Sequence, residues 1–266
     1  MDFSRFKAII IKNREYEMSV KEAIKDFHNQ VIWDGDIPKI MREIGKKLNT
    51  LIIEIPMRDN DFGACYLGTG YSKYLLLNSN QPRNKMYFSF CHDIYHILKG
   101  TPDYINEKRE VHFNQEYFEN ENESKANLFA ANLLMPEVEF KKMYDMFNVD
   151  SERIECVVVK LMNYFNAPFV AVLVRIYELR ILEDINVAKE LLDFNAEKIE
   201  ELFEELWLDK EILKASLKDE MGYLFETLKK EGNRLVKKEL LSESSLEGIL
   251  KNTWKLYLSI RVKQDE

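Results

Sequence analysis

The stretch YFSFCHDIYHILKG occupies residues 87–100 and says more about the fold and chemistry of this chain than any other segment. It places His92 and His96 four residues apart, and on an α-helix this spacing brings both imidazoles to one face. Two imidazoles so arranged can bind a single zinc ion. The apolar spacing around them predicts a helix over about 84–98, which ends before Gly100.

A third ligand is expected on another element, because a catalytic zinc takes three protein ligands and leaves one position open. The segment ESKANLFAANLLMP, at residues 123–136, predicts a second helix that begins at Glu123. Glu123 shares a face with Ala126, Asn127 and Ala130, and the small residues allow close approach to another helix. The predicted metal ligands are therefore His92, His96 and Glu123. The alternative is that the histidines are partly buried structural residues that bind no metal.

Asp93 follows the first histidine, at the position where HExxH enzymes carry a glutamate. In those enzymes the carboxylate takes a proton from zinc-bound water and later delivers it to the leaving amine. Zinc lowers the pKa of this water toward ~7, so a positioned carboxylate suffices at neutral pH. Asp93 is the predicted catalytic residue, with a side chain one methylene shorter than glutamate. The alternative is that its carboxylate lies too far from the water for catalysis.

The composition is that of a folded, helix-rich chain of 266 residues, with 46% apolar and 32% charged residues. The first residues lack the apolar core of a signal peptide, and no stretch approaches 18 apolar residues. Three widely spaced cysteines fit reduced thiols, so the expected compartment is the cytoplasm. The net charge of −8 provides no general attraction to nucleic acid or to an anionic membrane, and we expect neither as a direct partner.

The apolar patterns predict an α+β fold with a small β-sheet and packed helices. Helices are expected over 20–33 and 37–48, strands over 51–57, 64–67 and 74–77, and a polar connection over 101–122, between the two motif helices. From residue 185 the chain is rich in Glu, Lys and Leu, which predicts several helices, one of them capped by Asn195. We expect three units: a metallopeptidase-like domain (1–145), a helix-turn-helix-like segment packed on it (146–190) and a helical C-terminal extension (191–266).

The segment VVVKLMNYFNAPFVAVLVRIYELRIL, at residues 157–182, contains two apolar helical runs separated by Asn166-Ala167-Pro168. This is the spacing of a tight helix-turn-helix. A DNA-reading second helix would need polar and basic side chains, but this one offers mainly Arg175 and Arg180. A structural pair of helices packed on the core is the favoured interpretation.

The two motifs together resemble the ImmA/IrrE family of zinc metallopeptidases, in which an HExxH helix is followed by E-x-x-A-N-x-F-A-x-x-L-L-x-P. Residues 123–136 follow the second motif almost position for position, and the resemblance extends over roughly residues 20–185. It implies a gluzincin-like core that binds one zinc ion through His92, His96 and Glu123. It also implies a cytoplasmic endopeptidase that cleaves a specific helix-turn-helix repressor.

The chain departs from the family pattern at two places. Asp93 stands where the pattern has glutamate, and the tail after residue 185 resembles no accessory domain that we can identify. The first departure leaves a second hypothesis open, a catalytically weak or inactive pseudo-peptidase that acts as a regulator-binding module.

Overall fold

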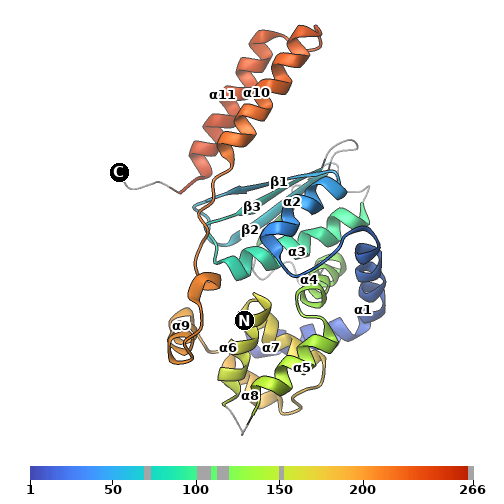
Figure 1. Cartoon of the computed structure of the whole chain (residues 1–266), viewed down its shortest axis with the longest axis vertical. Coiled ribbons are helices and arrows are strands. Elements are labelled where there is room, and N and C mark those ends of the chain that lie inside the picture. Colours follow the sequence, from blue (N-terminus) through green and yellow to red (C-terminus); the bar gives the residue numbers. More distant parts are fainter. Residues whose placement is uncertain (69–72, 101–108, 113–119, 150–152, 263–266) are drawn as a thin grey trace.

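The computed structural model describes residues 1–68, 73–100, 109–112, 120–149 and 153–262. Its elements alternate between helices and strands only in the first half of the chain, and the second half is helical (Figure 1). In chain order they are α1 (Phe3–Gln30), α2 (Ile37–Lys47), β1 (Thr50–Ile55), β2 (Phe62–Gly68), β3 (Lys73–Asn78), α3 (Arg83–Lys99), β4 (Arg109–His112), α4 (Glu121–Leu134), α5 (Glu137–Phe147), α6 (Ile154–Phe165), α7 (Phe169–Glu178), α8 (Ile185–Leu191), α9 (Ala196–Glu205), the 3-10 helix η3 (Lys210–Leu213), α10 (Met221–Lys237) and α11 (Glu243–Ile260). The predicted α+β class with a helical C-terminal region is confirmed.

The β-sheet has four strands in the order β1-β3-β2-β4. β1 runs parallel to β3, whereas β2 is antiparallel to both β3 and β4. Successive side chains of a strand point to opposite faces, so Leu75 and Leu77 of β3 join the main core while Leu76 packs on the other side. Both faces of the sheet are therefore covered, one by α3 and one by the C-terminal helices.

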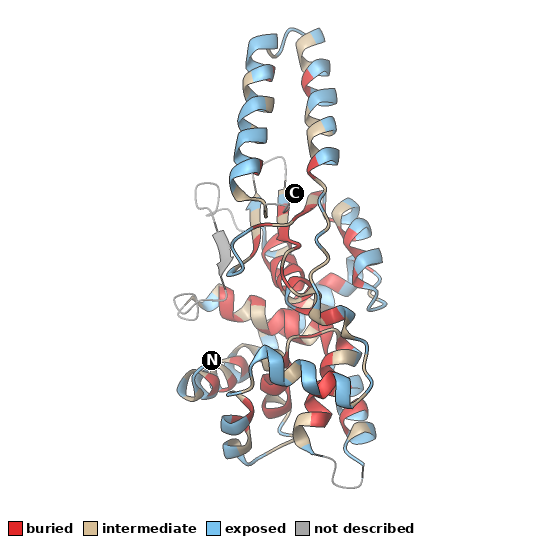
Figure 2. Ribbon diagram, turned by 90° about the vertical axis from the view of Figure 1, so that its left-hand side faces the viewer, coloured by how far each residue is buried: buried red, intermediate tan, exposed pale blue. Residues whose placement is uncertain are grey.

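The main core lies between one face of the sheet and the helices α1 to α9 (Figure 2). Helix α3 crosses its centre, and twelve of its 17 residues are buried, which leaves this helix almost no solvent-facing side. Its N-terminal end is fixed by the turn after β3, where the buried Asn78 bonds the backbone of Asp59, Phe62 and Met57. The helix ends at Gly100, whose φ of 53° suits a residue without Cβ.

Helices α10 and α11 form an antiparallel hairpin whose base covers the other face of the sheet (Figure 1). Met221 and Tyr257 pack there against Ile53 and Ile55. The Arg58 side chain donates hydrogen bonds to the carbonyl oxygens of residues 258, 259 and 261, which satisfies the C-terminal end of α11. The base of the hairpin is thus fixed by both apolar packing and backbone pairing.

Helices α6 and α7 form the predicted helical pair, and Asn166 at the break adopts a left-handed conformation with a φ of 51°. Arg175 does not face solvent: it is buried, pairs with Glu178 and donates hydrogen bonds to Asn132 Oδ1 and the Met135 carbonyl oxygen. Among the described residues, no single helix is long and apolar enough to span a membrane, and α6 and α7 satisfy that criterion only as a pair bent by 107°.

In the N-terminal half of the chain, two elements differ from the sequence prediction. α1 begins at Phe3 rather than near residue 20, because Asp2 caps it by accepting a hydrogen bond from the Arg5 backbone and because Phe6 and Ile10 are buried. β4 lies inside the stretch predicted as a polar connection, and it is held to β2 by strand pairing. The proposed three-part division of the chain stays a prediction.

Candidate metal centre

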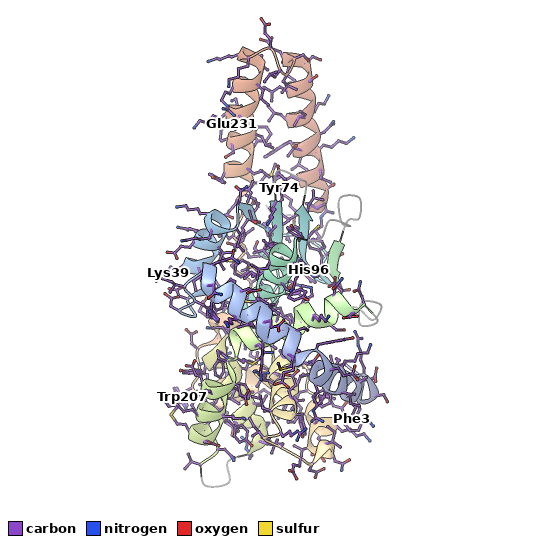
Figure 3. All side chains as sticks on the ribbon, turned by 90° about the vertical axis from the view of Figure 1, so that its right-hand side faces the viewer. Phe3, Lys39, Tyr74, His96, Trp207 and Glu231 are labelled. Atoms are coloured by element: carbon purple, nitrogen blue, oxygen red, sulfur yellow. The ribbon has the colours of Figure 1, made fainter. Side chains whose placement is uncertain are left out.

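The two paired histidines come from the middle of α3, where the helix is most deeply buried. Met86, Phe90 and Ile94 are each at most 2% exposed and fix the rotation of the helix against its neighbours. With that rotation set, His92 and His96 point to the same side, and their Nε2 atoms lie 3.2 Å apart. The i, i+4 spacing predicted from the sequence therefore brings the two imidazole rings together. Figure 3 labels the position of His96.

Helix α4 brings the third group. It packs directly on α3, and Ala126 and Ala130 are fully buried on it, so small side chains permit the close approach. Glu123 Oε2 lies 3.0 Å from His92 Nε2, and Glu123 Oε1 lies 3.4 Å from His96 Nε2. One ligand atom from each residue falls within 4.8 Å of the others, and all three residues are buried. This group could hold a metal ion.

The charges of these groups depend on one another. Burial alone would raise the pKa of Glu123, but the hydrogen bonds and charges of both histidines outweigh it and hold that pKa far below its usual value. For His92, burial lowers the pKa, and Glu123, Asp93 and Asn127 together reverse this and raise it. The buried Glu123 carboxylate thus favours a positive charge between itself and the two imidazoles, as a cation site requires.

Asn127 is a site residue whose role the sequence did not reveal. Its Oδ1 lies 2.9 Å from His92 Nδ1, so it accepts the Nδ1–H hydrogen bond and leaves Nε2 facing Glu123. The only signal in the sequence was its position on the same helical face as Glu123. Its hydrogen bond to His92 depends on how α4 is rotated against α3, which periodicity does not give.

Asp93 is buried next to the first histidine, at 1% exposure. Burial raises its pKa to about 7; the charge of His92 opposes this shift and that of Glu123 adds to it. Within the described part of the chain its Oδ2 atom has no hydrogen-bond partner. An unpaired buried carboxylate oxygen is costly, so this atom is available to a hydrogen-bond donor such as water.

The donor set fits a catalytic metal. Two imidazole nitrogens and one carboxylate are ligands that suit zinc, and three protein ligands leave one coordination position open. Asn127 also supplies the hydrogen bond to the outer ring nitrogen that metal-binding histidines usually make.

A buried His-His-Glu group on two packed helices is the donor set of one class of zinc peptidases. Residues 46–177 match the family model of the M78 peptidases, described as the IrrE N-terminal-like domain, and through this segment the chain belongs to that family. The matched region runs from the end of α2 into α7 and contains the three convergent residues. No curated protein matches the chain.

Proposed function

We propose that this protein is a zinc-dependent metalloendopeptidase that hydrolyses a peptide bond in a specific regulatory protein. The observation that carries the proposal is the convergence of His92, His96 and Glu123 in the buried interior of an M78-type domain. Membership of a peptidase family supports the reaction class, and the donor set supports zinc.

Zinc held by these residues would polarise the substrate carbonyl and lower the pKa of water toward ~7. The chain's own residues do the rest. Asn127 holds the His92 ring so that Nε2 faces the centre. Asp93, buried beside His92, would take a proton from the attacking water and pass it to the leaving amine. No covalent link between substrate and protein is needed.

The substrate class rests on resemblance to the ImmA/IrrE family. A cytoplasmic helix-turn-helix repressor is the proposed partner, and cleavage would relieve repression. Direct contact of this chain with nucleic acid is not part of the proposal.

A second function, a non-catalytic module that binds a regulator, is favoured by one observation: Asp93 occupies the position of the usual glutamate. Its carboxylate is one methylene shorter, and misplacement by about 1 Å can cost on the order of 100-fold in rate. The fold and the metal would then serve recognition only.

Metal content tests the premise. Elemental analysis of the purified chain, without chelators, should find about one zinc per molecule, and Glu123→Ala should lose it. Asp93→Ala should retain the metal, because Asp93 is not one of the three convergent groups. If Glu123→Ala still binds about one zinc per molecule, Glu123 is not a metal ligand.

Asp93→Glu separates the two functions. Cleavage of a helix-turn-helix repressor encoded beside this gene is assayed with both proteins at equal zinc content. Wild-type cleavage that depends on zinc supports the peptidase. A wild type that binds the repressor without cutting it, with no gain in Asp93→Glu, supports the binding module.

A further inference from the structure

Tyr66 lies on β2, and its side chain is on the face of the sheet that packs on α3. In the strand pairing it stands opposite Leu75 of β3, and directly paired residues place their side chains on the same face. Leu75 is 1% exposed and belongs to the core between the sheet and the helices. The Tyr66 ring packs against this core but is only partly buried. It therefore points toward α3 and remains partly accessible to solvent.

The level of this ring along α3 follows from the contacts between β3 and α3. The Lys73 side chain, at the start of β3, donates a hydrogen bond to the Ile97 carbonyl oxygen near the end of α3, at 3.2 Å. The end of β3 leads through a short turn into the start of α3, so strand and helix run in opposite directions. The two steps from Lys73 to Leu75 cover about 7 Å of strand, the rise of about four to five helical residues. The tyrosine paired with Leu75 is therefore level with His92 and Asp93.

Tyr66 and Asp93 also influence each other electrostatically. Burial raises the pKa of Tyr66, and the negative charge of Asp93 raises it further. The hydroxyl is therefore protonated at neutral pH and can donate a hydrogen bond. Among the described residues, the Tyr66 hydroxyl and Asp93 Oδ2 have no hydrogen bond to each other or to another group. Both groups can therefore bind a molecule that enters beside α3.

Gly68 leaves room for the hydroxyl. It follows Tyr66 by two residues on β2, so both positions share one face of the strand. A Cβ at Gly68 would lie only 2.8 Å from the Tyr66 hydroxyl oxygen. Because that oxygen is the far end of a side chain, a larger residue at position 68 would displace the hydroxyl without disturbing the backbone of the sheet.

We propose that Tyr66 is a catalytic residue of the peptidase, with its hydroxyl donating a hydrogen bond to the oxygen of the scissile carbonyl. This inference rests on the proposed function. When the oxygen of water bonds to the carbonyl carbon, an electron pair of the C=O bond moves onto the carbonyl oxygen, which becomes negatively charged. A neutral phenol placed there stabilises this charge and keeps its own proton. Asp93 accepts the proton of the water, so the two side chains act on different atoms of the same step.

Tyr66→Phe removes only the hydroxyl and tests the proposal. Cleavage of the helix-turn-helix repressor is compared at equal zinc content, and we expect kcat to fall about 100-fold with KM changed less than about twofold. Gly68→Ala should also lower kcat, because it displaces the hydroxyl. Tyr74→Phe is the matched control: Tyr74 lies on the neighbouring strand, is 42% exposed, points to the other face and should leave cleavage unchanged.

Binding of a stable analogue gives a second readout, which does not depend on turnover. A phosphinic peptide built on the mapped cleavage site carries a tetrahedral, negatively charged group at the scissile position, and such analogues bind to what stabilises the transition state. Tyr66→Phe should weaken its binding at least about tenfold and leave binding of the product peptide unchanged. Equal weakening of both peptides would show a contact with the substrate alone and would overturn the proposal.

The outcomes separate this inference from the proposed function. Wild-type cleavage with an unchanged rate in Tyr66→Phe overturns the inference and leaves the proposed function standing. Loss of bound zinc in Tyr66→Phe would indicate a structural role and would also overturn it. If only Asp93→Glu cleaves, the Tyr66 comparison is made in that background. If neither the wild type nor Asp93→Glu cleaves with zinc bound, the proposed function fails and the catalytic role of Tyr66 fails with it.

Discussion

Asn127 accepts a hydrogen bond from Nδ1 of His92, at 2.9 Å. This contact fixes the ring orientation and holds a proton on Nδ1, so that Nε2 is the ring nitrogen that can lose its proton and bind a metal. Replacing Asn127 by Leu keeps a similar volume but removes the acceptor. We expect the zinc affinity of Asn127→Leu to fall about 10- to 100-fold, measured by competition with a coloured chelator.

Two further variants separate positioning from simple loss of packing. Asn127→Asp retains an oxygen at the same place and should recover most of the affinity. Ser124→Ala changes another buried position of α4, leaves the His92 contact intact and should bind zinc like the wild type. Unchanged affinity in Asn127→Leu would show that the hydrogen bond does not orient the ligand.

The difference between predicted and unpredicted site residues has a physical cause. His92 and His96 could be predicted from sequence because both lie on one helix, where spacing determines direction. Glu123 was predicted from a second motif, and the small residues of its helix supported close packing. The contact of Asn127 and the unpaired oxygen of Asp93 depend on the relative placement of α3 and α4. That placement is a property of the packed core.

At the scale of elements, a buried polar network joins three helices of the core. Arg175 of α7 bonds Asn132 and the Met135 carbonyl oxygen at the end of α4, and it pairs with Glu178. Glu178 also accepts a hydrogen bond from Asn13 of α1. The network therefore fixes the end of α4, the helix that carries Glu123 at its other end.

Removing one partner of this buried pair should be costly. Arg175→Met leaves the Glu178 carboxylate buried without its cation, and we expect a loss of about 3–5 kcal/mol in the free energy of unfolding, measured in urea. The double variant Arg175→Met with Glu178→Met removes both charges and should lose less than the single variant. Equal losses in the two variants would mean that the apolar packing of α7, rather than the ion pair, dominates.

Helices were easier to predict than sheet edges. α2, α3 and α4 lie within two residues of their predicted bounds, because their apolar periodicity is local and strong. β4 escaped prediction because its sequence, REVH, has no distinctive pattern and its position comes from pairing with β2. The N-terminal part of α1 escaped because its few core contacts, such as Phe6, are made with distant helices.

At the scale of the whole molecule, the metal would connect two helices that are separated in the sequence. Zinc held between α3 and α4 would stabilise only the folded state, by about 2.7 kcal/mol at 100 times its dissociation constant. Chelation should therefore lower the unfolding temperature by roughly 5–10 °C, at about 2–4 °C per kcal/mol for a chain of this size. Scanning calorimetry with and without chelator measures this change in unfolding temperature. In Glu123→Ala the chelator should change the unfolding temperature little.

The base of the C-terminal hairpin packs on the sheet and is needed for the stability of the protein, whereas the outer half of the hairpin is not. Met221 and Tyr257 cover Ile53, Ile55 and Met57 on the sheet. Ending the chain after residue 220 would expose these three side chains at about 1.5–3 kcal/mol each, a loss comparable to the ~5–15 kcal/mol total stability of a typical domain. We expect this truncated protein to be insoluble or unfolded.

Replacing residues 229–250 by a short glycine-serine turn keeps the base packing, so this variant should fold and bind zinc with unchanged affinity. An unfolded outer-half deletion, or a soluble and zinc-binding truncation at residue 220, would contradict this division of the hairpin.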